Sequence, residues 1–248
     1  MEPRTLKELD VKGDVVLLFS GGIDSFIGRH WLLKQEANFA CVYFDLSSGY
    51  SAKELKYVMK LVPTTTIDTT LDWLGRFEVG DKAFVPYRNL YLAMTASLRY
   101  AKNVCICGLK DDSVSDKNQK VFKLWSNHLS EIGNANVNVF SPFWNMTKRQ
   151  IVRWYLDTGG TEKAILKTVS CYSPKDTRYC KMCPSCFRKY IALRANGIDI
   201  QFSNLDLAYD YYRRCKGGEY DEVRTKDTLC VLEKDFRFYR QSKKGGAR

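Results

Sequence analysis

The stretch LLFSGGIDS, residues 17–25, joins an apolar run to the start of a helical pattern. The run at 14–19 predicts a buried strand, and two glycines with the hydroxyls of Ser20 and Ser25 follow it. Glycines let backbone N–H groups approach an anion closely, and the helix dipole favours negative charge at a helix start. The segment therefore predicts a phosphate-binding loop, with a plain strand-to-helix turn capped by Asp24 as the alternative.

This loop differs from two common nucleotide-binding loops. It lacks the Gly-Lys-Ser/Thr with which a P-loop grips the β and γ phosphates. It also lacks the third glycine and the spacing of a dinucleotide fingerprint. Kinase and dehydrogenase functions are therefore disfavoured.

Strand-like and helix-like segments alternate after the loop. Apolar runs predict strands at 39–44, 64–68, 104–108 and 137–142, and periodic patterns predict helices at 51–62, 88–102, 119–132 and 148–159. Strands separated by helices indicate an α/β fold with a doubly wound parallel sheet. Ligands bind such sheets beyond the carboxyl ends of the strands, where Ser20, Asp45, the 109–118 loop and Pro142 all fall.

Length and composition set the domain organisation. The 248 residues are 45% hydrophobic and 27% charged, which is typical of a globular chain with one large domain and a small appendage. We expect residues 1–160 to form the α/β domain and residues 161–248 to form a helical and loop region packed on it. No apolar run has the roughly eighteen residues of a membrane span, and the first residues lack a signal peptide's apolar stretch, so a cytoplasmic protein is expected.

Four of the nine cysteines are clustered at metal-ligand spacing. They form a C-x8-C-x2-C-x2-C pattern and are Cys171, Cys180, Cys183 and Cys186. Four thiolates suit tetrahedral Zn²⁺ in a closed structural site, which would help to fold a loop-rich region with little core. An iron–sulfur cluster and unrelated thiols are the alternatives. Cysteines 41, 105 and 107 lie in strand-like runs, where burial as small apolar side chains is expected.

The formal net charge of +11 favours anionic partners. Nucleotides, pyrophosphate and RNA all satisfy this preference, so the charge does not choose among them. The basic runs near Arg213 and Lys243 are expected to be solvated surface.

Four further segments of interest follow the Ser-Gly-Gly-x-Asp-Ser loop along the chain. They are VPYRNLYL at 85–92, VCICGLKDDSVSD at 104–116, SPFWNMTK at 141–148 and SCY followed by CKMCPSCFRK at 170–189. Together they resemble the 7-cyano-7-deazaguanine synthase family of PP-loop ATP pyrophosphatases over roughly residues 14–195. The most specific element is Ser-Cys-Tyr followed by Cys-x2-Cys-x2-Cys-x-Arg at 170–188.

The resemblance implies an ATP-dependent ligase of queuosine biosynthesis. In that family ATP adenylates the carboxylate of 7-carboxy-7-deazaguanine, and ammonia displaces AMP to give an amide. A second ATP activates the amide for dehydration to the nitrile, with AMP and pyrophosphate released. Such a reaction needs a held leaving group, cations for its growing charge and a pocket that excludes water.

The resemblance also implies roles for individual residues. ATP would be held by Ser20, Gly21, Gly22, Asp24 and Ser25. Lys148 and Arg88 would neutralise pyrophosphate, and Asp112 or Asp116 would carry Mg²⁺ or read the base. The alternatives are a solvated helix start for Arg88 and Asn89, a surface cation for Lys148 and a solvated loop for the aspartates. Partners would be a small 7-deazaguanine acid and ammonia, and a homodimer is left open.

Two loops depart from the family pattern. FDLSSGY at 44–50 stands where the family shows Phe-Asp-Tyr-Gly-Gln, and DSVSDKN at 112–118 replaces a Tyr-Pro-Asp-Cys-Arg run. The amide as final product, or another heterocyclic acid as acceptor, therefore stays open.

Two rival functions remain. One is a tRNA-modifying PP-loop enzyme that adenylates an RNA base, which the charge suits but for which the chain has little room for an RNA-gripping domain. The other is a non-enzymatic zinc module that binds nucleic acid. The second leaves the α/β half of the chain unexplained.

Overall fold

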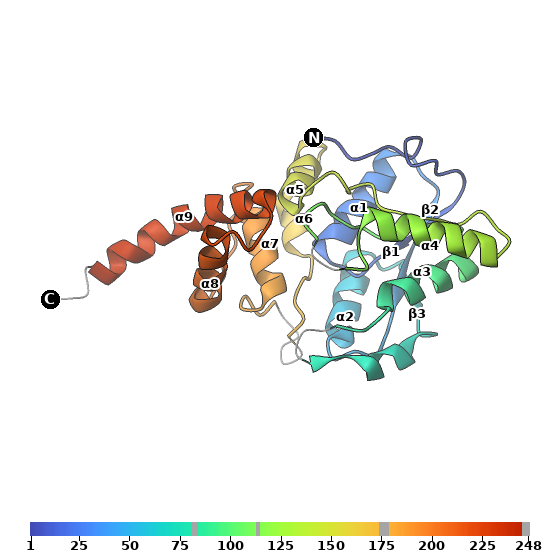
Figure 1. The fold of residues 1–248 in the computed structure, drawn as a ribbon, viewed down its shortest axis with the longest axis horizontal. Helices are drawn as coiled ribbons and strands as arrows, with labels where there is room; N and C mark the ends of the chain where they lie inside the picture. Colours follow the sequence, from blue (N-terminus) through green and yellow to red (C-terminus); the bar gives the residue numbers. More distant parts are fainter. Residues whose placement is uncertain (81–83, 113–114, 174–178, 245–248) are drawn as a thin grey trace.

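A computed structural model describes residues 1–80, 84–112, 115–173 and 179–244. Its sheet has the strand order β3-β2-β1-β4-β5, and every neighbouring pair is parallel (Figure 1). The strands are β1 (Val15–Leu18), β2 (Phe39–Phe44), β3 (Thr66–Asp68), β4 (Asn103–Cys105) and β5 (Asn138–Phe140). All five lie within the runs that the sequence predicts, apart from the first residue of β4.

The strands are buried on both faces. Successive side chains of a strand point to opposite sides, so Leu17 joins one apolar cluster and its neighbour Val16 joins the other. On β4, Cys105 and Val104 divide in the same way. Burial on both sides explains why these strands read as continuous apolar runs.

Five helices cover the two faces. The side of Leu17 is covered by α1 (Ile23–Lys34), α2 (Ser51–Leu61) and α5 (Lys148–Asp157), and the side of Val16 by α3 (Arg88–Arg99) and α4 (Gln119–Ile132). The predicted doubly wound α/β fold is confirmed. A short 3₁₀ helix, η1 (Asp72–Phe77), was not predicted.

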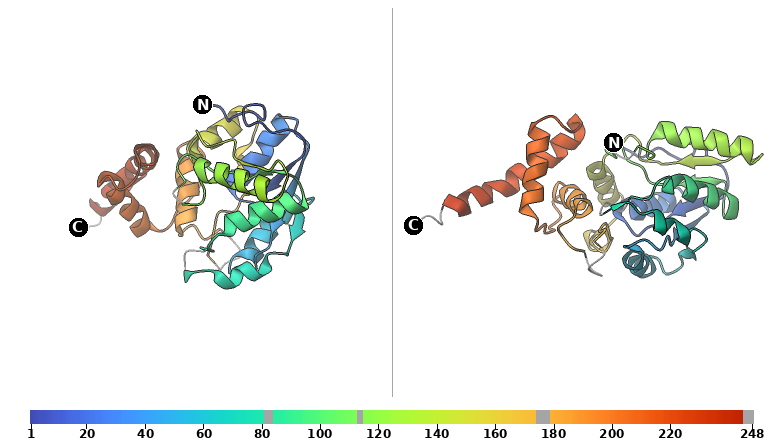
Figure 2. Two further views of the ribbon diagram at one scale, coloured as in Figure 1. Left: turned by 45° about the vertical axis from the view of Figure 1, so that its right-hand side comes forward. Right: turned by 60° about the horizontal axis from the view of Figure 1, so that its bottom comes forward.

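Four further helices follow the α/β half in the described chain. They are α6 (Glu162–Leu166), α7 (Pro184–Arg194), α8 (Leu205–Lys216) and α9 (Glu222–Lys244). A separate apolar cluster joins α7, α8 and α9, and in it the rings of Phe187 and Tyr211 stack with centroids 4.4 Å apart. Figures 1 and 2 show α9 running outward from this cluster. No helix among the described residues is long and apolar enough to cross a membrane.

Candidate active site

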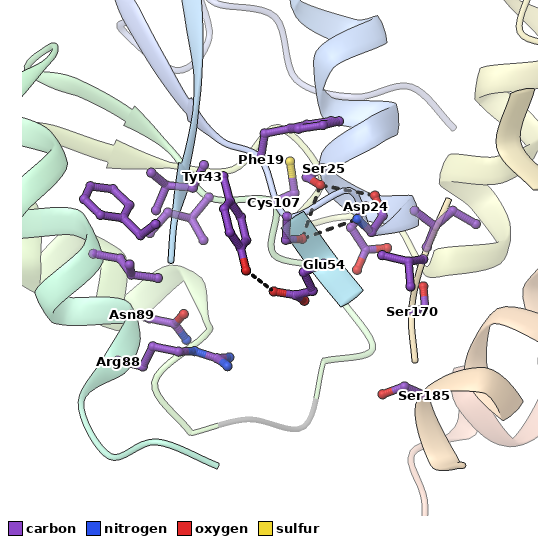
Figure 3. A pocket seen from close by; sticks show the side chains of 18 of the residues that line it. Phe19, Asp24, Ser25, Tyr43, Glu54, Arg88, Asn89, Cys107, Ser170 and Ser185 are labelled. Carbon is purple, nitrogen blue, oxygen red and sulfur yellow. Dashed lines mark hydrogen bonds between the residues drawn. The ribbon is translucent and has the colours of Figure 1, made fainter. Parts of the chain in front are cut away.

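A cavity of about 260 Å³ opens at the carboxyl ends of β1, β2 and β4. The strand order reverses at β1, because β2 lies on one side of it and β4 on the other. In open α/β sheets this reversal point is where ligands bind. Figure 3 shows side chains from the glycine loop, α2, α3 and the C-terminal region around the cavity.

The glycine loop forms the floor of the cavity between β1 and α1. Gly21 has a φ of +69°, and a Cβ there would lie 3.3 Å from the Val58 nitrogen of α2, so glycine suits the position on two counts. Gly22 is the N-cap of α1 without a side-chain cap. The Ser25 hydroxyl donates to the Gly22 carbonyl and lies 3.4 Å from the Ser20 hydroxyl. The first turn of α1 therefore faces the cavity with N–H groups and hydroxyls suited to an anion.

An ion pair stands beside the loop. The Lys148 Nζ lies 2.6 and 2.7 Å from the two carboxylate oxygens of Asp24. Lys148 opens α5 directly after Thr147, which forms a reciprocal capping box with Gln150. This cap fixes the start of α5, so Lys148 is only 8% exposed while its ammonium reaches the cavity.

A second charge cluster centres on Asp112. Its carboxylate lies 3.1 Å from both the Lys117 ammonium and the Arg188 guanidinium. Burial opposes ionisation, but the charges of Lys117, Arg188 and Lys148 outweigh it and hold the pKa of Asp112 well below its usual range. Asp111, 3.6 Å from Arg188, has its pKa raised by burial. The cavity thus gathers three cations near the glycine loop.

Aromatic side chains form another wall. Arg88, at the start of α3, donates a 2.9 Å hydrogen bond to the Tyr50 hydroxyl. The Tyr50 ring lies 5.0 Å from that of Tyr172, the residue after Cys171. Asn89 donates to both carboxylate oxygens of Asp116 at 3.2 Å. A flat heterocycle bound on this side would meet aromatic faces and an arginine.

Glu54 reaches the cavity from α2. Its carboxylate accepts a 3.3 Å hydrogen bond from the Tyr43 hydroxyl, as Figure 3 shows. Burial raises the pKa of Glu54 to about 7, although the charge of Arg88 works in the other direction. A carboxyl with such a pKa in a ligand cavity can accept or donate hydrogen bonds near neutral pH.

The four cysteines come together next to this cavity. Their sulfurs all lie within 4.8 Å of one another, and two of the separations are 3.4 and 3.6 Å. Zn–S bonds of about 2.3 Å in a tetrahedron place sulfurs about 3.8 Å apart. Backbone N–H groups of Cys180 and Cys183 point at sulfurs of the cluster at 3.4 Å. This all-thiol set fits a closed Zn²⁺ site.

Most of the predicted site residues line one cavity. They are Ser20, Gly22, Asp24, Ser25, Arg88, Asp112 and Lys148. Gly21 lies beneath, where its carbonyl accepts a 2.9 Å hydrogen bond from the Val169 nitrogen. Asp116 is held by Asn89 and is not among the lining residues.

The sequence did not single out Glu54, Lys117, Arg188 or Tyr172, which also line the cavity. Arg188 had a signal, because it is the arginine of the Cys-x-Arg pattern, and Tyr172 is the tyrosine of Ser-Cys-Tyr. Glu54 and Lys117 had none, since each lies among other charged residues of ordinary surface type.

The chain is similar in sequence to known protein families. The profile of the family described as "Queuosine biosynthesis protein QueC" matches residues 75–197, and that of "Thiamine biosynthesis protein (ThiI)" matches residues 10–71. The 7-cyano-7-deazaguanine synthase of Methanothermobacter thermautotrophicus is 30% identical over 217 residues, which cover 74% of this chain and 96% of that protein. The chain belongs to the 7-cyano-7-deazaguanine synthase family. It is therefore homologous to enzymes, as its resemblance implied.

The chain is also similar, at lower identity, to two other proteins. The 7-cyano-7-deazaguanine synthase 2 of Sulfurisphaera tokodaii is 26% identical over 240 residues, covering 82% of this chain and 51% of that protein. A crystal structure described as a "predicted subunit of tRNA methyltransferase" from Methanocaldococcus jannaschii has 16% identity and a TM-score of 0.44. It covers 62% of this chain and 85% of its own, and a TM-score this low supports no further statement.

Proposed function

We propose that the chain is an ATP-dependent ligase that converts 7-carboxy-7-deazaguanine and ammonia to 7-cyano-7-deazaguanine through adenylated intermediates. AMP and pyrophosphate are released. The observation that carries the proposal is one cavity in which the glycine loop and its cations face an aromatic wall. Phosphate activation of a flat acid needs both surfaces at one site.

The loop side is assigned to ATP. The α1 N-terminus, Ser20 and Ser25 would hold the phosphates, with Gly21 and Gly22 allowing the close approach. Lys148 would neutralise the leaving pyrophosphate, and Lys117 and Arg188 supply two further cations in reach of the same cavity. In the free protein these cations form ion pairs with Asp24 and Asp112. Binding of the phosphates would draw the cations away from the two carboxylates.

Magnesium has a matching donor set in this proposal. Asp24 and Asp112 carry carboxylate oxygens at the cavity, and hard oxygen ligands are what Mg²⁺ prefers. A magnesium ion there would supply charge neutralisation of the triphosphate. Asp112 is then a binding residue for the nucleotide complex, in keeping with its strongly lowered pKa.

The aromatic side is assigned to the acceptor acid. Tyr50 and Tyr172 offer ring faces for the deazaguanine. Glu54 would hydrogen-bond the N–H groups of its pyrimidine edge. Arg88, which is hydrogen-bonded to Tyr50, would counter negative charge on the acceptor as it approaches the α-phosphate.

Product analysis tests the proposal. The zinc-loaded protein is incubated with ATP, magnesium, ammonium and 7-carboxy-7-deazaguanine, and nucleotide and heterocycle are followed by mass spectrometry. AMP together with the nitrile is the expected result. AMP with only the amide would support the adenylation step. It would also indicate that the altered loops stop the reaction at the amide. If the protein binds ATP but forms no AMP, 7-carboxy-7-deazaguanine is not its substrate.

A further inference from the structure

Two buried lysines lie near the cysteine cluster. The Lys53 ammonium, on α2, lies 3.3 Å from the Cys171 sulfur and also donates to the Ser173 carbonyl. Lys189, on α7 three residues after Cys186, donates to the Thr168 carbonyl at 2.5 Å. Its ammonium also lies 5.3 Å from the centre of the Tyr179 ring, whose hydroxyl donates to the Cys186 carbonyl.

Neither lysine has a carboxylate partner among the residues that the structure describes. Lys53 is 5% exposed and Lys189 is 2% exposed. Burying an ammonium without an anion is costly, and lysine is almost never fully buried unpaired. Two such lysines near four thiols require an explanation.

Charge balance supplies that explanation. Zn²⁺ bound by four thiolates carries a net charge of 2 − 4 = −2. With both side chains protonated, Lys53 and Lys189 add +2, which balances this charge among the described residues. The hydrogen bond from the Lys53 ammonium to the Cys171 sulfur also fixes that ligand, as partners around other metal sites do.

Lys53 connects the cluster to the cavity. The helix that carries it also carries Glu54, and its Val58 nitrogen would lie 3.3 Å from a Cβ at Gly21. On the other side of the contact, Cys171 is followed by Tyr172, which lines the cavity. Two residues before Cys171, the Val169 nitrogen donates a hydrogen bond to the Gly21 carbonyl. The contact between Lys53 and Cys171 therefore joins two segments that each form part of the same cavity.

We propose that Lys53 and Lys189 neutralise the metal-bound cysteine cluster, and that Lys53 thereby fixes α2 against the 169–173 segment so that the cavity is assembled. Lys53 is a positioning residue in this scheme. The second half of the inference rests on the proposed binding of ATP, whereas the first half does not.

The first test is metal retention by the full-length, zinc-loaded protein. We expect the variant Lys53→Gln to release Zn²⁺ to a chromogenic chelator about 10- to 100-fold faster than the natural sequence. Lys56→Gln removes an exposed charge from the same helix and should stay within about twofold. Lys53→Arg keeps the charge and should retain most of the metal affinity. Release from Lys53→Gln at the rate of Lys56→Gln would overturn the inference.

Lys189→Gln provides the same measurement from the second helix if Lys53→Gln fails to fold. Nucleotide affinity, measured by titration with a non-hydrolysable ATP analogue, tests the positioning. We expect the zinc-loaded Lys53→Gln protein to bind the analogue at least about fivefold more weakly than Lys56→Gln. Faster zinc release with unchanged affinity would overturn the positioning of α2. Failure of the natural sequence itself to bind the analogue would overturn the proposed function and leave the metal-retention result standing.

Discussion

Lys148 forms an ion pair with Asp24 in the ligand-free cavity, and this pair holds its ammonium group where a phosphate would bind. The two side chains are 2.6 Å apart and both line the cavity, so neither charge is left unpaired in the free protein. A bound pyrophosphate would offer Lys148 a more highly charged partner at the moment of bond breaking. Interactions that strengthen in the transition state are the ones that accelerate a reaction.

Replacing Lys148 tests this role. We expect Lys148→Met to lower the rate of AMP formation by about 10²- to 10³-fold, the scale on which removal of one such charge stabiliser acts. AMP release at saturating ATP is the measurement. Lys163→Met, which alters an exposed lysine of α6, is the matched control and should leave the rate unchanged. An equal rate in the two variants would show that Lys148 does not contribute to AMP formation.

Glu54 makes stability depend on pH in a defined direction. Its pKa in the folded protein, about 7, lies above the ordinary value of 4.5, so folding favours its protonated form. This stabilisation is complete below about pH 4.5 and is lost as the pH rises through about 7. Because water in the cavity screens part of the effect, we expect a loss of about 1–2 kcal/mol in the free energy of unfolding between pH 5 and pH 8.

Urea unfolding of the natural sequence and of Glu54→Gln at both pH values isolates this contribution. The variant should lose less stability than the natural sequence over the same interval. Glu131→Gln, which changes an exposed glutamate at the end of α4, should behave as the natural sequence does. Identical pH dependence in Glu54→Gln would show that Glu54 ionises normally.

At the scale of elements, α1 lies unusually close to the segment after β4. A Cβ at Gly28 would lie 2.3 Å from the Cys107 sulfur, inside the apolar core. This contact, rather than backbone conformation, explains the glycine in the middle of α1, since its φ is not in the left-handed region. The thiol fills the space that a larger residue at position 28 would need.

A mutant cycle tests this packing. We expect Gly28→Ala to destabilise the protein by about 1–3 kcal/mol through overpacking. Cys107→Ala removes the opposing sulfur, so the double variant should be less destabilised than the sum of the single variants, with a coupling of about 0.5–3 kcal/mol. Chemical denaturation of all four proteins gives these values. Strict additivity would contradict the close contact.

The elements that the sequence predicted are those whose signal is local. Strands buried on both faces read as apolar runs, and the amphipathic helices α2 to α5 have a clear period. The helix η1 was missed because six residues of 3₁₀ geometry have no such period. Motifs in the sequence predicted the glycine loop and Lys148, whereas Glu54 and Lys117 reach the cavity only through the packing of α2 and the contact of Lys117 with Asp112.

At the scale of the whole molecule, α7 belongs to two cores. Its Phe187 and Tyr190 pack with α8 and α9, while Leu193 of the same helix packs in the large core of α1 and α5. The expected boundary near residue 160 remains a proposal. In this arrangement residues 161–248 would be a region packed on the α/β domain rather than an independent domain, because it shares a helix with the larger core.

Leu232, on α9, offers a test of that sharing. It is 1% exposed within the small cluster, so Leu232→Ala should cost about 2–5 kcal/mol. If α7 couples the two cores, calorimetry of the zinc-loaded protein should show one transition, displaced by about 5–15 °C as a whole. Leu98→Ala, at a 78% exposed position of α3, is the control and should leave the transition in place. Two separate transitions, of which Leu232→Ala moves only one, would instead mean that the region beyond residue 160 folds on its own.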